Sequence, residues 1–214
     1  MEPSGETVGG RVLNTEPGPE RARLGFKEAV LSGFKFLTDL GLHPVEEKLT
    51  FVRYASPDVF VNVYHGRASF ELGVEIGRLK QPDNEKLTIH DIVAAAGAEK
   101  AEGFGQHVMF QISSPEGVRE LVPKLARLLE KYGTPFLKGD ATAYRTALEA
   151  RSRAAADYVK QTNLSNVHRK AEAAWQAKDY AQVVELYRPV RKDLTEVEAK
   201  KLAYAERQAS GPHF

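Results

Sequence analysis

Seven polar residues between positions 53 and 75 are the part of the chain best suited to form a reactive or binding site. They are Arg53, Asn62, Tyr64, His65, Arg67, Glu71 and Glu75. Carboxylates and an imidazole can act as general acids and bases, and a guanidinium can hold an anionic group. A small hydrolase or transferase with a polar site on a sheet would draw on all of them but Arg67.

The spacing of the two glutamates argues against acid–base catalysis by that pair alone. Glu71 and Glu75 are four residues apart, so in a strand they share one face and lie about 13 Å apart at the usual rise per residue. Glycoside cleavage by two carboxylates needs roughly 5–10 Å. Arg53 or Arg67 could pair with either glutamate from a neighbouring strand or turn. The pattern favours a solvated sheet face with cross-strand charge pairs.

Other chemistries lack the residues that they need. The chain has no cysteine, which removes disulfides, thiolate metal sites and cysteine nucleophiles. No two of the six histidines have the spacing of paired metal ligands, and only His65 lies near the candidate residues. The sequence also lacks a serine nucleophile elbow, a phosphate-binding loop and a dinucleotide-binding glycine motif. We therefore predict neither a metal nor a cofactor.

Charge and hydropathy limit the partners and the location. The chain has 30 Lys and Arg against 29 Asp and Glu, a formal net charge of +1. Nucleic-acid-binding proteins usually show a clear basic excess, so we predict no nucleic-acid partner. No stretch approaches the 18 or so apolar residues of a membrane span, and the first twenty residues lack an apolar signal core. These features predict a cytoplasmic protein that is not bound to a membrane.

Three strand-like runs would position the candidate residues. They read EKLTFVRY (47–54), DVFVNVYH (58–65) and SFELGVEIGRL (69–79), are rich in Val, Phe, Tyr and Ile, and are separated by turn residues. That pattern is typical of an antiparallel β-meander, whose uncovered edge could pair with a second copy of the chain. An apolar stripe predicts a helix over residues 21–41, and Ser114-Pro115 is typical of a second helix start. Residues 107–113 could form a fourth strand or lead into that second helix.

The fold class predicted is α+β, an antiparallel meander of three to four strands packed by helices and followed by an all-helical C-terminal region. Residues 1–20 are predicted to be a disordered arm, 21–138 the α+β domain and 139–210 the helical appendage. Within the appendage, residues 163–166 are expected to break a helix. Asp179-x-x-Gln182 and Thr195-x-x-Glu198 have the spacing of capping boxes.

Residues 171–190, AEAAWQAKDYAQVVELYRPV, carry a resemblance to a known family. Trp175, Asp179-Tyr180 and the run 184–187 stand where one tetratricopeptide-repeat hairpin places its packing residues, although Val183 replaces the alanine that the repeat prefers. The resemblance implies an interaction surface or a helical brace and no catalysis. Trp175 and Tyr180 are therefore candidate docking residues, and the alternative is that they form the core of their own hairpin.

The N-terminal two-thirds resembles small uncharacterised α+β proteins of bacteria, some of which neutralise toxins as immunity proteins. The residues that carry this likeness are FVRYxSP (51–57), VxVxVY (59–64) and ELxVxIG (71–77). The leading hypothesis is a non-enzymatic protein-binding module of bacterial type with a protein partner. An immunity protein is a narrower version, and the hydrolase or transferase is the alternative from another class.

Overall fold

The computed structural model describes residues 19–66, 69–81, 85–103 and 110–209. The chain divides into two compact units, Met1–Glu149 and Ala150–Phe214. The first unit combines an antiparallel sheet with helices, and the second is helical. The predicted α+β class with a helical C-terminal region is therefore confirmed.

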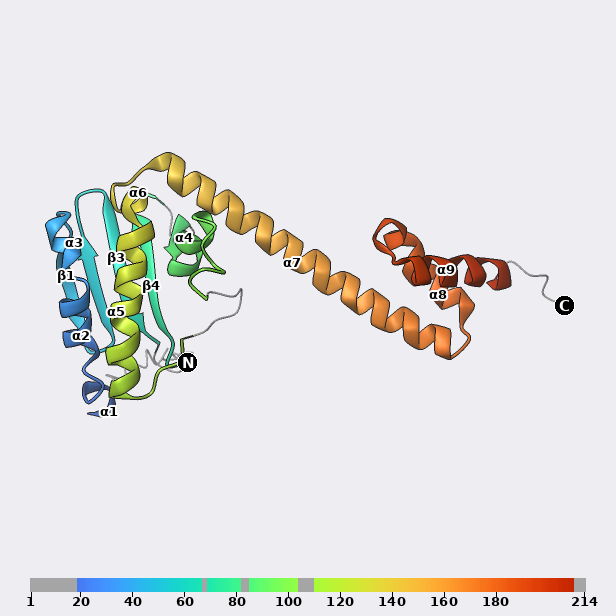
Figure 1. Ribbon diagram of the computed structural model, residues 1–214, viewed down its shortest axis with the longest axis horizontal. Helices are drawn as coiled ribbons and strands as arrows, with labels where there is room; N and C mark the ends of the chain where they lie inside the picture. Colours follow the sequence, from blue (N-terminus) through green and yellow to red (C-terminus); the bar gives the residue numbers. More distant parts are fainter. Residues whose placement is uncertain (1–18, 67–68, 82–84, 104–109, 210–214) are drawn as a thin grey trace, which may run out of the picture. The chain divides into compact units, whose positions relative to one another are not determined.

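The sheet is a five-stranded antiparallel meander in which the strands pair in chain order (Figure 1). Its strands are β1 (His43–Lys48), β2 (Phe51–Ala55), β3 (Val59–His65), β4 (Leu72–Arg78) and β5 (Leu87–Thr88). The prediction of a single first strand over EKLTFVRY was wrong, because the chain turns at Leu49 and Thr50. Both residues have the composition of a strand, so the turn leaves no mark in the local pattern.

One face of the sheet forms the core of the first unit. Alternate residues of the three central strands lie on it: Val52 and Tyr54, then Val59, Val61 and Val63, then Leu72, Val74 and Ile76. This alternation follows from the pleat of a strand, in which successive side chains point to opposite faces. Phe70, two residues before β4 begins, is exposed and adopts a φ of 54°.

Helices cover this core face, and Figure 1 shows α2 (Phe26–Gly33) and α5 (Pro115–Tyr132) lying across the sheet. The buried apolar residues of α2, α4 (Ile89–Ala95), α5 and α6 (Thr134–Leu137) all join the same core. Two of these helices have N-terminal caps formed by side chains. Thr88 and Asp91 form a capping box for α4, and the Ser114 hydroxyl accepts a hydrogen bond from the backbone N–H of Gly117.

The prediction of one helix over residues 21–41 was wrong. Three short helices occupy this stretch: α1 (Pro19–Ala22), α2 and α3 (Phe36–Asp39). Gly25, at a φ of 63°, precedes α2 in a left-handed conformation that glycine adopts without cost. Of the ambiguous segment 107–113, residues 107–109 lie outside the described part of the chain. The carbonyl of Phe110 accepts from the backbone N–H of Leu72, and the N–H of Ile112 donates to the carbonyl of Phe70.

The second unit contains most of α7 (Ala141–Gln176), with α8 (Tyr180–Tyr187), the 3-10 helix η2 (Arg188–Asp193) and α9 (Glu196–Ala209). The predicted break at 163–166 was wrong, because α7 runs through it. The Asp179 carboxylate accepts from the backbone N–H of Gln182, and Thr195 and Glu198 cap α9 reciprocally. The core of this unit is small: Ala171, Ala174, Val183, Val184, Tyr187, Leu202 and Ala205.

Candidate functional sites

The sheet face opposite the core brings together four of the predicted site residues. Arg53 pairs with Asn62 across β2 and β3, and Asn62 pairs with Glu75 across β3 and β4, so the three side chains form one row. Tyr64 lies on the same face, two residues beyond Asn62 on β3. We call Arg53, Asn62, Tyr64 and Glu75 the outer-face cluster. Phe60 is buried on this face too, but it is not part of the core on the other side.

Aromatic rings close over the backbone on both sides of Glu75. A β-carbon at Gly73 would collide with the ring of Tyr64, and one at Gly77 would lie 2.6 Å from Cζ of Phe60. The Arg53 guanidinium in turn sits 4.4 Å from the centre of the Phe60 ring. The two glycines of β4 therefore allow the rings of β3 to lie flat on the neighbouring strand.

Glu75 is held by groups on both neighbouring segments. Its Oε2 accepts a hydrogen bond from Nδ2 of Asn62 at 3.3 Å and lies 3.6 Å from Nζ of Lys86. Among the described residues, the cation that pairs with Glu75 is thus Lys86 and not Arg53, one of the two arginines that the sequence had suggested. Within the described residues, Arg53 Nε and Asn62 Oδ1 are buried without a hydrogen-bond partner. The row therefore contains a carboxylate that is paired with a lysine, one N–H donor without an acceptor (Arg53 Nε) and one acceptor oxygen without a donor (Asn62 Oδ1).

Tyr64 is poorly suited to proton transfer near neutral pH. Burial, together with the carboxylates of Glu71 and Glu75, raises the pKa of Tyr64 to about 12, because both disfavour the phenolate. A general acid or base works best with a pKa near the working pH. The phenol is better suited to packing and hydrogen bonding.

His65 lies on the other face of the sheet, so it does not meet the outer-face cluster. Its ring is 2 % exposed and stacks on Phe26. Nδ1 lies 2.7 Å from Nη1 of Arg21, and Nε2 lies 2.7 Å from the carbonyl oxygen of Ile112. A guanidinium can only donate, so Nδ1 accepts and Nε2 carries the proton that it donates to Ile112. This imidazole is a structural tie between α1, β3 and the segment ahead of α5.

The environment of His65 favours the neutral ring. Burial lowers the pKa of His65, and the charge of Arg21 acts in the same direction, while the hydrogen bond to Ile112 acts against them. Arg21 is itself buried and its guanidinium lies 3.8 Å from the centre of the Phe70 ring. A proton on Nδ1 would remove the acceptor for Arg21 and place two cations in contact.

The two remaining sheet candidates stand apart. Arg67 lies outside the described residues. Glu71 precedes β4 and forms an isolated antiparallel bridge with Gln111. The predicted pairing of two copies through a sheet edge meets obstacles at β1, which contains Pro44 and a register irregularity before Glu46, both features that oppose edge pairing.

Trp175 and Tyr180 form a second candidate site together with Tyr204. Ring centroids are 5.7 Å apart between Trp175 and Tyr180 and 5.5 Å apart for each of the other two pairs, all in edge-to-face contact. They border a hollow of about 480 Å³ whose lining also includes Val197, Lys200, Lys201 and Arg207. We call these seven residues the aromatic hollow.

Sequence reasoning missed the residues that α9 contributes to this hollow. Val197, Lys200, Tyr204 and Arg207 recur at spacings of three and four, which places them on one side of a helix. That signal was present in the sequence. What it could not show is that this side of α9 borders the end of α7, because the contact depends on how α8 and η2 turn the chain back.

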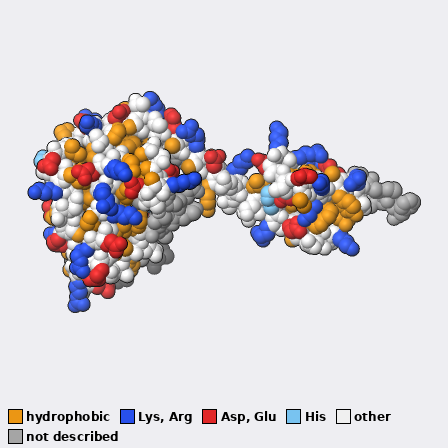
Figure 2. Space-filling view, in the orientation of Figure 1, with side chains coloured by type: hydrophobic (Ala, Val, Ile, Leu, Met, Phe, Trp, Pro, Cys, Tyr) orange, Lys and Arg blue, Asp and Glu red, His pale blue; other side chains and the backbone are white. Residues whose placement is uncertain are grey.

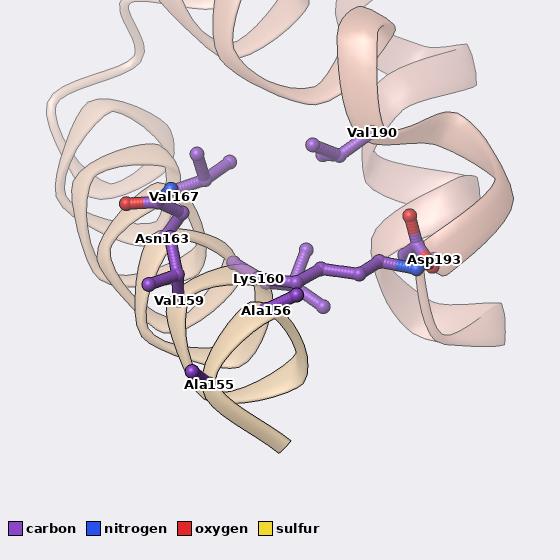
Figure 3. A pocket seen from close by; sticks show the side chains of 9 residues that line it. Ala155, Ala156, Val159, Lys160, Asn163, Val167, Val190 and Asp193 are labelled. Carbon is purple, nitrogen blue, oxygen red and sulfur yellow. Dashed lines mark hydrogen bonds and ion pairs between the residues drawn. The ribbon is translucent and has the colours of Figure 1, made fainter. Parts of the chain in front are cut away.

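A larger groove of about 620 Å³ lies elsewhere in the second unit. Figure 3 shows Ala156, Val159 and Val167 of α7 across from Val190 and Asp193 of η2. Lys160 reaches over to Asp193, with Nζ 2.9 Å from Oδ1. The lining is mostly apolar, and Val159 is strongly exposed. The groove thus offers packing surface and one ion pair.

Comparison with family models, with curated proteins and with solved structures finds no match to this chain. The described residues contain no group of three or more His, Asp or Glu side chains arranged to hold a metal ion. Among the helices that the structure describes, none is both long and apolar enough to cross a membrane.

The buried imidazole predicts a loss of stability in mild acid. The folded pKa of His65 lies below the unfolded value of about 6.5, so the unfolded chain binds more protons. The contribution of His65 to stability is complete above about pH 6.5 and decreases as the pH falls below that value. Urea unfolding at several pH values should show this loss of stability below about pH 6.5 in the wild type but not in the His65→Gln variant. His43→Gln, at an exposed position, is the control.

An NMR titration of the His65 ring in the wild-type protein checks the same point without a variant. A ring that titrates at or above about 6.5 would contradict the prediction.

The contact between Tyr64 and Gly73 predicts a second effect. Gly73→Ala should lower the free energy of unfolding by about 1–3 kcal/mol, because the new methyl group needs the space that the Tyr64 ring fills. In a Tyr64→Ala background the same change should be neutral or stabilising, since alanine costs less than glycine inside a strand. Denaturant unfolding of the four proteins of this cycle gives the coupling. Equal costs in the two backgrounds would show that the ring and the glycine are not in contact.

Proposed function

We propose that this protein is a non-enzymatic binding module that holds another protein at the aromatic hollow of its second unit. The observation that carries the proposal is the exposure of apolar side chains around this hollow. Val197 is 63 % exposed and Tyr204 is 40 % exposed, although both line the same hollow as Trp175 and Tyr180.

The core of the second unit does not account for this exposure. Trp175 and Tyr180 pack partly against that core, so they contribute to the hairpin itself. Val197 and Tyr204 are not among the residues that pack on it. A large aromatic residue that is left in water beside two others is typical of an interaction site.

The residue types also support a protein partner. Trp, Tyr and Arg are enriched among the residues that dominate binding energy in protein interfaces, and they act best where a partner can exclude water. The hollow combines Trp175, two tyrosines and Arg207.

The alternative reaction site on the sheet receives less support. The residues that would share the work are divided, with His65 on the core face and Glu75 on the outer face. Glu75 is paired with Lys86, and Tyr64 has a pKa too high for proton transfer near neutrality. We therefore propose a protein partner in the cytoplasm. A toxin-neutralising immunity protein would differ from this proposal only in the identity of the partner that it binds.

Tyr204→Ala should weaken partner binding by at least about tenfold, the loss expected for a buried interface anchor. Tyr158→Ala is the matched control, because Tyr158 is an exposed tyrosine on α7 of the same unit. The full-length chain is used as bait in native lysate, with quantitative mass spectrometry of what is recovered.

The expected result is a stoichiometric protein that the wild type and Tyr158→Ala retain and Tyr204→Ala loses. The proposal fails if no stoichiometric partner is recovered at any salt concentration, or if both variants retain the same partners. Circular dichroism melting of each variant verifies that the second unit is folded.

A further inference from the structure

The two units carry opposite formal charges, which the total of +1 conceals. Residues 150–214 contain 12 Lys and Arg against 8 Asp and Glu, a net charge of +4. Residues 1–149 contain 18 against 21, a net charge of −3. In Figure 2 basic side chains stand beside hydrophobic ones on the visible face of the second unit. The basic excess therefore belongs to the unit that contains the aromatic hollow.

The lining of the hollow concentrates this charge. Three of its seven residues are cations, Lys200, Lys201 and Arg207, and none is acidic. Two acids nearby, outside the lining, each engage one of the lysines: Glu196 pairs with Lys200 and Glu172 pairs with Lys201. The Glu196–Lys200 pair is an exposed pair within one helix, so it contributes little and is readily exchanged.

The cations and the apolar groups lie on the same side of α9. Lys200, Tyr204 and Arg207 are spaced by four and three residues, so a line from the first to the last is about 10 Å long at the rise of a helix. Tyr204 lies between the two charges. Lys201 adds a third cation, with Nζ 5.4 Å from the centre of the Trp175 ring.

We infer that the partner segment is acidic and carries a large apolar side chain next to its carboxylates. The inference rests on the proposed function and adds the chemistry of the ligand. The apolar side chain packs against Tyr204, Val197 and Trp175, while the carboxylates pair with Lys200 and Arg207. A partner carboxylate that pairs with Lys200 takes the place of Glu196, whose exposed pair with Lys200 contributes little.

A protein segment fits this hollow better than a nucleic acid. Single-stranded nucleic acids stack their bases on open aromatic faces. Here the three rings contact one another edge to face, and Lys201 lies over Trp175. Val197, an aliphatic residue, completes the lining and suits an aliphatic or aromatic side chain.

The test is a selection from a random dodecapeptide phage library on the full-length protein. Selection on the wild type should enrich peptides with Asp or Glu flanking Phe, Leu or Trp. Selection on the double variant Lys200→Glu and Arg207→Glu should lose that enrichment. Arg153→Glu with Lys170→Glu is the matched control, because it makes the same change in charge at exposed positions on α7.

Fluorescence anisotropy with the most enriched peptide then measures affinity. The double variant should bind at least about tenfold more weakly than the control, and raising the salt concentration should weaken the wild type more than the double variant. A peptide with Gln in place of each acidic residue should bind the wild type more weakly by a similar factor. The neutral pair Lys200→Gln and Arg207→Gln repeats the measurement if the charge reversal prevents folding.

The outcomes separate the two proposals. Enriched peptides that are neutral but still need Tyr204 would overturn the acidic partner and leave the binding module in place. Enrichment that does not depend on Tyr204 would overturn both, as would the absence of enrichment. A 12-nucleotide oligo-dT that binds through Lys200 and Arg207 more tightly than any selected peptide would assign the hollow to single-stranded nucleic acid and overturn the inference.

Discussion

The alternation of side chains along β3 is the constraint on which the first unit depends. Val59, Val61 and Val63 face the helices, whereas Phe60, Asn62 and Tyr64 face away. A shift of one residue in the pairing would move the three valines out of the core and place an amide and a phenol in it. Each unpaired buried polar group would cost about 1–3 kcal/mol. The register of β3 therefore follows from its valines, and its neighbours adapt to it.

The same alternation decides which chemistry the sheet can support. His65 follows Asn62 by three residues on β3, so the two lie on opposite faces, and Glu75 shares the face of Asn62 because the two are paired across the strands. Asn62, Tyr64 and His65 lie within four positions in the sequence. Because of the pleat, the imidazole of His65 contacts Arg21 on one face and the amide of Asn62 contacts Glu75 on the other. The glycines of β4 then let the rings of β3 close over the strand beside Glu75. The outer face thus packs aromatic rings beside Glu75 and does not assemble an acid–base site.

Sequence patterns succeeded where the determining contacts are local. The caps at Thr88, Ser114, Asp179 and Thr195 each depend on a residue three positions away, and all four are present. The break expected at residues 163–166 fails because Asn and Ser cost a helix only some tenths of a kcal/mol each. Ala171 and Ala174 of the same helix are buried in the second core. The turn at Leu49 and Thr50 and the meeting of Tyr204 with Trp175 both depend on tertiary structure, so no short window of sequence contains them.

The charges of the second unit cannot specify a partner by themselves. At physiological ionic strength electrostatic interactions fade over about 8 Å, so a net charge of +4 mainly speeds encounter with acidic surfaces in general. Selectivity requires a contact that water and salt do not replace, and the exposed Val197 and Tyr204 provide one. A partner with carboxylates alone would bind weakly and with strong salt dependence, whereas an apolar side chain between those carboxylates would use the rings and the cations together. The position of Tyr204 between Lys200 and Arg207 on α9 is what couples the two contributions.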